Sequence, residues 1–124
     1  MLKQNSWIID TEGDSFNPSK FHCLSVVQSE DDIHSTSDYD EMRSFFNSAE
    51  TLICHNIQRA DYVWIEKILG VSLDDKRIID TLPLSWALFP DRDRHGLYDW
   101  GNTLGIPKVD IQDEIAKYIF TSKY

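Results

Sequence analysis

The stretch of residues 7–13 constrains the fold most, because a short apolar run turns acidic just before it ends. Residues 7–9 favour a β-strand, and Gly13 marks its end. Side chains two positions apart on a strand point to the same face, so Asp10 and Glu12 are expected to project together. Paired carboxylates repel each other unless protons or a cation compensate them, and hard oxygen ligands suit Mg²⁺ or Mn²⁺. A solvated turn before the glycine is the simpler alternative.

A second acid follows a strand in the middle of the chain. Residues 51–54 are another short apolar strand candidate, and from Asp61 the apolar residues have helical spacing as far as Gly70. Asp61 therefore falls in the first turn of a helix, where the helix N-terminus favours negative charge. Alone it is equally well explained as a helix-start acid. Combined with Asp10 and Glu12, it predicts one acidic pocket at the strand ends.

These motifs resemble the 3′–5′ exonuclease domain of family A DNA polymerases, particularly those of phages, in the DEDD (DnaQ-like, ribonuclease-H-like) nuclease superfamily. Asp10-Thr11-Glu12 matches the first exonuclease motif, and His55-Asn56 followed by Asp61 matches the second. The resemblance covers roughly residues 7 to 108. Weaker matches follow in the same order as in the family: Lys20-Phe21-His22-Cys23, Ile79-Asp80-Thr81-Leu82, and His95-Gly96-Leu97 with Trp100-Gly101 and Leu104-Gly105.

The resemblance implies two-metal hydrolysis of phosphodiester bonds at a DNA 3′ end, with Mg²⁺ or Mn²⁺ as cofactor. It makes Asp10, Glu12 and Asp61 the metal ligands and catalytic residues. His55, Asn56 and Arg59 would contact the nucleic acid. Phe16 and Tyr62 are candidate stacking faces for a base, although core packing explains them equally well.

The C-terminus departs from this family. The family's third motif is a Tyr followed, after three residues, by the last metal-binding Asp. The available match here is Tyr118, with Ser122 in the position of that Asp, so the domain is expected to be C-terminally shortened. Asp110, Asp113 and Glu114 lie on the same predicted helix and are alternative ligands, or simply a solvated acidic face.

The remaining pattern predicts a single α/β domain over residues 1–124, and the resemblance implies that this domain is of ribonuclease-H-like type. We expect a mixed, partly antiparallel sheet of about three to five strands, flanked by helices. The chain is long enough for its own core. The other expected elements are a strand at 21–28, a helix from an N-cap at Ser37 to about Ala49, and helices at 83–88, 97–104 and 111–120.

Charge and cysteine content limit the environment and the partners. The 12 basic and 21 acidic residues leave a net charge of −9, whereas proteins that grip nucleic acid unaided usually carry a basic stripe. Cys23 and Cys54 each lie in a strand candidate and are expected to be buried free thiols. No apolar stretch has the pattern of a signal peptide or a membrane span. A cytoplasmic location without a membrane partner is therefore expected, and the resemblance to phage polymerases implies a phage-infected bacterium.

Three functional hypotheses follow. The first is an exonuclease acting on single-stranded DNA ends, weakened or completed by a partner such as a polymerase chain. The second is a catalytically inactive, acidic nuclease-fold protein that binds another protein, for example a viral inhibitor of a nucleic-acid-binding host defence enzyme. The third is a truncated fragment with neither role. The three acids Asp10, Glu12 and Asp61 favour the first hypothesis, whereas the incomplete third motif and the net charge of −9 favour the second.

Overall fold

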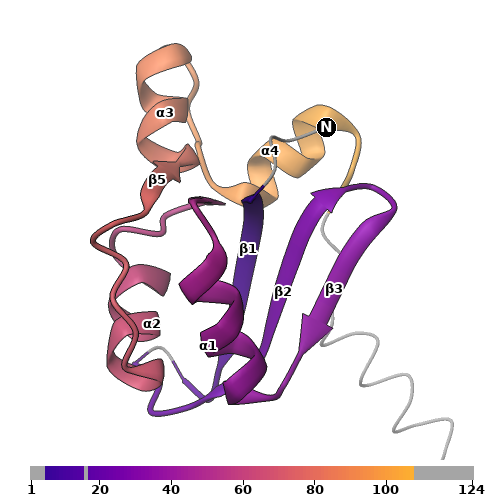
Figure 1. The fold of residues 1–124 in the computed structure, drawn as a ribbon. Coiled ribbons are helices and arrows are strands. Elements are labelled where there is room, and N and C mark those ends of the chain that lie inside the picture. Colours follow the sequence, from indigo (N-terminus) through magenta and orange to yellow (C-terminus); the bar gives the residue numbers. More distant parts are fainter. Residues whose placement is uncertain (1–4, 16, 108–124) are drawn as a thin grey trace, which may run out of the picture. The chain divides into compact units, whose positions relative to one another are not determined.

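The computed structural model describes residues 5–15 and 17–107, and over these residues it forms a five-stranded mixed sheet (Figure 1). The order is β3-β2-β1-β4-β5, in which β1 to β3 are antiparallel neighbours and β1, β4 and β5 run parallel. Parallel strands end at the same edge, so the carboxyl ends of β1, β4 and β5 lie together. The strands are β1 (Ser6–Gly13), β2 (Phe21–Ser29), β3 (Asp32–Thr36), β4 (Thr51–Cys54) and β5 (Arg77–Asp80).

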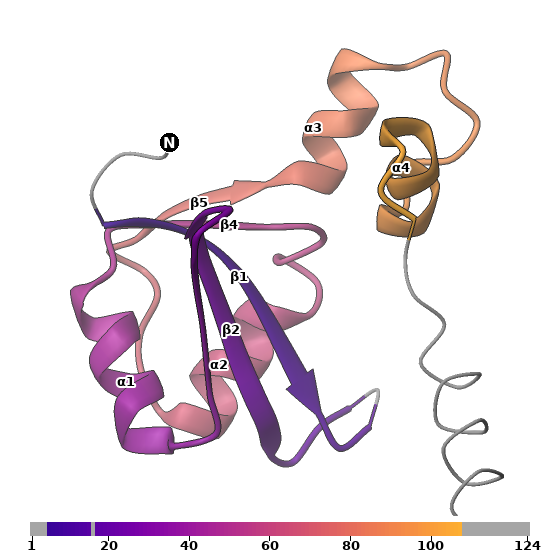
Figure 2. The same ribbon diagram turned by 90° about the vertical axis from the view of Figure 1, so that its right-hand side faces the viewer.

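Two helices, α1 (Tyr39–Ser48) and α2 (Asp61–Leu69), pack on one face of the sheet (Figures 1 and 2). Each contributes apolar side chains at helical spacing, and these meet alternate residues of the strands. The predicted fold class, a mixed sheet flanked by helices, is confirmed. The core that joins the two layers includes Met42 and Phe46 of α1, Ile65 and Leu69 of α2, and Ile9, Leu24 and Leu52 of the sheet.

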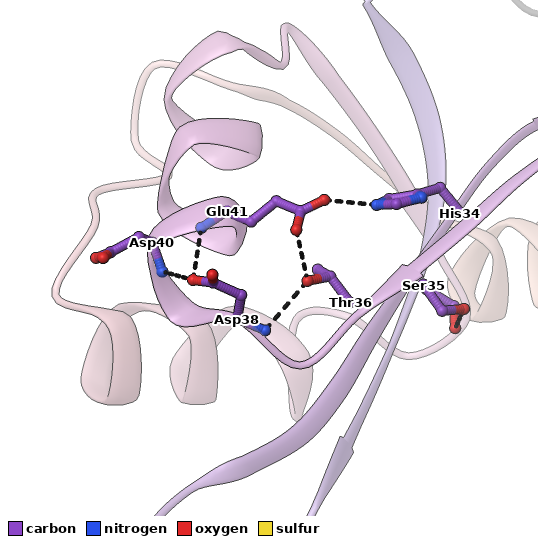
Figure 3. Close-up of polar contacts among 7 residues, drawn as sticks. His34, Ser35, Thr36, Asp38, Asp40 and Glu41 are labelled. Atoms are coloured by element: carbon purple, nitrogen blue, oxygen red, sulfur yellow. Dashed lines mark hydrogen bonds and ion pairs between the residues drawn. The ribbon is translucent and has the colours of Figure 1, made fainter.

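Asp38 begins α1, one residue after the predicted N-cap (Figure 3). Its Oδ1 accepts hydrogen bonds from the main-chain N–H groups of Asp40 at 2.8 Å and Glu41 at 3.2 Å. The prediction of Ser37 was wrong because the residue with extended backbone and a carboxylate in reach of these amides is Asp38. Helix α2 ends at Gly70 as predicted, with a left-handed φ of 69°.

The chain divides into two units, Met1–Pro90 and Asp91–Tyr124. The first holds the sheet, α1, α2 and α3 (Thr81–Leu88), and the second holds α4 (Leu97–Leu104). In the second unit the guanidinium of Arg92 lies 3.9 Å from the centre of the Trp100 ring and donates to the main-chain oxygen of Asp99. Arg92 therefore organises its own unit. A single domain over residues 1–124 stays a prediction.

Several expectations fall on parts of the chain outside the described residues. They are the last helix at 111–120, the third-motif match at Tyr118 and Ser122, the acids Asp110, Asp113 and Glu114, and the stacking candidate Phe16. Among the described residues, no helix has the length and apolar character that crossing a bilayer requires.

Candidate functional site

Asp10 and Glu12 lie toward the carboxyl end of β1, at the edge where β4 and β5 also end. Both are exposed, whereas Thr11 between them is 9% exposed. This alternation follows the two-residue period of a strand and confirms that the two carboxylates share a face. Opposite them on β2 lie Ser25 and Cys23, respectively. The pair thus presents accessible carboxylates on a strand that is held in place by its neighbour.

Asp61 is the first residue of α2 and is 7% exposed. Its Oδ2 accepts a hydrogen bond of 2.7 Å from the Thr11 hydroxyl, so Asp61 reaches β1 on the buried side of the strand. Burial raises the pKa of the Asp61 carboxyl, and the hydrogen bond from Thr11 opposes that rise. The structure therefore brings Asp61 to β1, the strand that carries Asp10 and Glu12. Its contact there is with Thr11, which lies between these two acids.

The three acids predicted to share one pocket do not form a complete metal cage in this structure. Among residues 5–15 and 17–107, no group of three or more His, Cys, Asp or Glu side chains is close enough to hold a metal ion. The reason lies in the strand's period, because Thr11 and the exposed pair point to opposite faces. Asp10 and Glu12 share one face, and Asp61 is engaged on the other.

Cys54 ends β4 and shows how much negative charge gathers at this edge. Burial is the main factor that raises the pKa of its thiol, and the charges of Asp61, Asp10 and Asp80 raise it further. As predicted, Cys54 is a buried free thiol, whereas Cys23 is free and only half-buried. Carboxylates from β1, α2 and β5 therefore surround the end of β4.

The turn after β4 carries His55, Asn56 and Arg59. The Nδ1 atom of His55 is 2.9 Å from the Thr81 hydroxyl oxygen, and the main-chain N–H of Asn56 donates to Asp80 at 2.8 Å. Arg59 is exposed on the same turn. The predicted nucleic-acid contacts thus lie at the edge of the sheet that also carries the acids.

A cleft of about 320 Å³ opens beside the end of β1. Its walls come from the end of β1 and the loop that follows, and from Trp64 on α2: Thr11, Glu12, Gly13, Asp14, Ser15 and Trp64. In the sequence, Trp64 is one of the apolar residues that follow Asp61 at helical spacing. Its position three residues after Asp61 was the available signal, because residues at this spacing lie on the same side of a helix.

Tyr62, the other stacking candidate, is used differently. Its hydroxyl donates to Asp74 Oδ1 at 2.8 Å, and this bond is the main factor that raises the pKa of Tyr62 to about 12. Its ring packs partly against the core. Trp64 rather than Tyr62 therefore lines the cleft beside Glu12.

This chain matches known proteins in structure but not in sequence. No protein-family model matches the sequence, and neither does any curated protein. A solved structure described as the apo form of a nuclease matches with a TM-score of 0.68 and 18% identity, over 86% of this chain and 55% of that chain. NrnC of Brucella melitensis matches with a TM-score of 0.66 and 18% identity, over 87% of this chain and 56% of that one.

These likenesses establish the fold. The described sheet and helices share the fold of these two solved structures, and the mixed sheet flanked by helices that the sequence predicts is present. The chain spans little more than half the length of either structure, 55% and 56%. Activity and substrate are therefore inferred from the residues of the site.

Proposed function

We propose that this chain is a metal-dependent 3′–5′ exonuclease-type domain that removes nucleotides from DNA ends. The observation that carries the proposal is the exposed pair Asp10 and Glu12 at the end of β1, beside the start of the helix that carries Asp61, on a nuclease-type fold. Carboxylates on neighbouring elements at the carboxyl edge of a sheet are suited to phosphodiester hydrolysis with a divalent cation.

The carboxylates of Asp10, Glu12 and Asp61 are the kind of ligand that Mg²⁺ or Mn²⁺ prefers, and two of the three are placed to bind a cation. Asp10 and Glu12 supply accessible hard oxygens, whereas Asp61 is held by Thr11. In the proposed site Asp10 and Glu12 would hold the cation, and Asp61 would either join them after leaving Thr11 or act on them through the Thr11 hydroxyl. When bound, the cation would activate water and stabilise negative charge on the phosphate. The metal-binding Asp of the third motif has no match here, so a fourth carboxylate would come either from residues outside the described ranges or from a partner chain.

Other residues at this edge of the sheet would contact the DNA strand. His55, Asn56 and Arg59 lie on one turn and offer hydrogen-bond donors and one cation for the sugar and phosphate groups. Trp64 offers an aromatic wall for an unpaired base beside Glu12. The net charge of −9 weakens long-range attraction of DNA, so we propose that a partner, such as a polymerase chain, delivers the end.

The test is degradation of a 5′-labelled single-stranded DNA oligonucleotide with Mg²⁺ or Mn²⁺, comparing the wild-type protein with Asp10→Ala. Asp31→Ala is the matched control, because Asp31 is an exposed acid in the β2–β3 turn, away from the site. We expect stepwise shortening from the 3′ end in the wild type and in the control. The shortening should stop with a chelator and fall by a hundredfold or more, roughly, in Asp10→Ala.

A second function has support from a specific observation. The described residues contain no complete metal cage, and the net charge is −9. An acidic nuclease-fold protein without catalysis could bind a nucleic-acid-binding protein in place of its DNA. No shortening with either metal, with or without a polymerase chain, would favour this function, and Asp10→Ala would then bind the same protein as the wild type.

A further inference from the structure

Asp80 ends β5, begins α3, and accepts hydrogen bonds from three main-chain N–H groups. Its Oδ1 accepts from Leu82 at 3.0 Å and from Asn56 at 2.8 Å. Its Oδ2 accepts from Gln58 at 3.2 Å. The bond from Leu82 belongs to the start of α3, but Asn56 and Gln58 precede Asp80 by 24 and 22 residues. One carboxylate therefore ties the turn after β4 to the junction of β5 and α3.

The turn that Asp80 holds has an unusual backbone. Asn56 has a positive φ of 65°, a conformation that asparagine tolerates better than most residues. Ile57 is completely buried, at 0% exposure, and anchors the turn from inside. His55 is fixed separately, through its bond to the Thr81 hydroxyl. The presentation of His55 and Asn56 is thus set by a segment that follows them by more than 20 residues.

Asp38 provides an internal comparison. It also begins a helix, and its carboxylate also accepts from two N–H groups, those of Asp40 and Glu41 (Figure 3). Both of these groups belong to α1 itself. A helix start is satisfied by bonds of this kind. The two bonds from Asn56 and Gln58 to Asp80 therefore exceed what capping α3 requires.

We propose that Asp80 is a positioning residue, which holds the His55–Asn56 turn in the conformation that receives the nucleic-acid strand. This inference rests on the proposed function, since it assigns Asp80 to strand binding at the same site. Asp80 itself need not touch the substrate. Its carboxylate fixes the main chain of Asn56 and Gln58, and thereby the places from which the nearby side chains reach the strand.

Asp80→Ser separates positioning from capping. Serine is a good N-cap and retains the start of α3, but its single short hydroxyl cannot accept from Asn56, Gln58 and Leu82 together. Asp38→Ser is the matched control on α1. Asp80→Asn is the conservative variant, because its amide oxygen can replace Oδ1 while the bond from Gln58 is lost.

Two readouts are measured on the full chain. The first is hydrogen exchange of the Asn56 and Gln58 amides, which should quicken by about tenfold or more in Asp80→Ser relative to amides of β4. The second is the kinetics on a 5′-labelled thymidine oligonucleotide with Mg²⁺ or Mn²⁺. We expect KM to rise by about tenfold while kcat changes by less than about threefold. Asp80→Asn should fall between Asp80→Ser and the wild type, and Asp38→Ser should change neither readout.

Unchanged exchange at Asn56 and Gln58 in Asp80→Ser would overturn the inference, as would faster exchange with an unchanged KM. An equal rise of KM in Asp38→Ser would also overturn it, because helix capping would then suffice as the explanation. If the wild-type protein neither binds nor cuts the oligonucleotide, the proposed function fails and with it the role in strand binding. Amide exchange then still decides whether Asp80 fixes the turn.

Discussion

Replacement of Thr11 with valine tests the contact that joins the start of α2 to β1. Valine preserves the shape of the side chain but removes the hydroxyl that donates to Asp61 at 2.7 Å. Hydrogen bonds to charged groups contribute about 1.5–3 kcal/mol, and Asp61 is only 7% exposed, so water cannot replace the lost donor easily.

We therefore expect Thr11→Val to lower the free energy of unfolding by about 2 kcal/mol at neutral pH. For a chain of this length, that corresponds to a fall of roughly 6–10 °C in the melting temperature. Chemical denaturation followed by circular dichroism measures the difference. Thr36→Val is the control at an exposed site, where the Thr36 hydroxyl donates to the Glu41 carboxylate at 2.9 Å and accepts from the main-chain N–H of Asp38 at 3.1 Å. The free energy of unfolding should fall clearly less in Thr36→Val than in Thr11→Val.

The effect should also depend on pH with a definite sign. Burial raises the pKa of Asp61 above that of the unfolded chain, so its contribution to stability is complete below the unfolded pKa and is lost as the pH rises through the folded pKa. Removal of Thr11 raises the folded pKa further, so the loss should be larger at about pH 7 than at about pH 4. A loss no greater than that of Thr36→Val, or one equal at both pH values, would refute this reasoning.

Three further predictions concern other parts of the first unit. Asp61→Asn should abolish cleavage but raise the melting temperature at neutral pH, because the neutral amide avoids the cost of a buried charge. This gain should disappear below the ordinary Asp pKa of 3.8, as thermal denaturation at several pH values would show. The hydrogen bond between His34 and Glu41 is the main factor that lowers the pKa of the Glu41 carboxyl (Figure 3). The stability that the ionised Glu41 contributes is lost as the pH falls through this lowered pKa. His34→Ala should therefore raise the pKa of Glu41 toward 4.5, as an NMR titration would show. Gly13→Ala should lower the free energy of unfolding by about 1–3 kcal/mol in urea, because the new Cβ would lie 2.6 Å from Cβ of Pro18.

Each of these has a contradicting result. Cleavage by Asp61→Asn at the wild-type rate would remove that acid from the proposed site. A Glu41 pKa that stays depressed without His34 would assign the shift to Thr36, the second donor. Gly70→Ala serves as the control for Gly13→Ala, because its strain comes from a φ of 69° with no atom within 4 Å of the new Cβ. If only Gly70→Ala destabilised the protein, the contact with Pro18 would not be a tight one.

The sequence alone determined the elements whose signal is local. Apolar runs followed by a turn residue predicted β1, β2 and β4, and helical spacing with a terminal glycine predicted α2 and α4 closely. Strand period also placed Asp10 and Glu12 on one face. Strand β3 went unpredicted, because it is a short and largely exposed edge strand that lacks an apolar alternation.

Only the tertiary structure decided how these elements meet. The bond between Thr11 and Asp61 joins residues 50 positions apart, and Asp80 reaches Asn56 across 24 positions. No local pattern encodes such pairs, because they depend on which strands become neighbours and on the face from which each side chain projects. Trp64 illustrates the same limit, since helical spacing predicted an apolar side chain but only the packing of α2 beside the end of β1 placed it along the cleft.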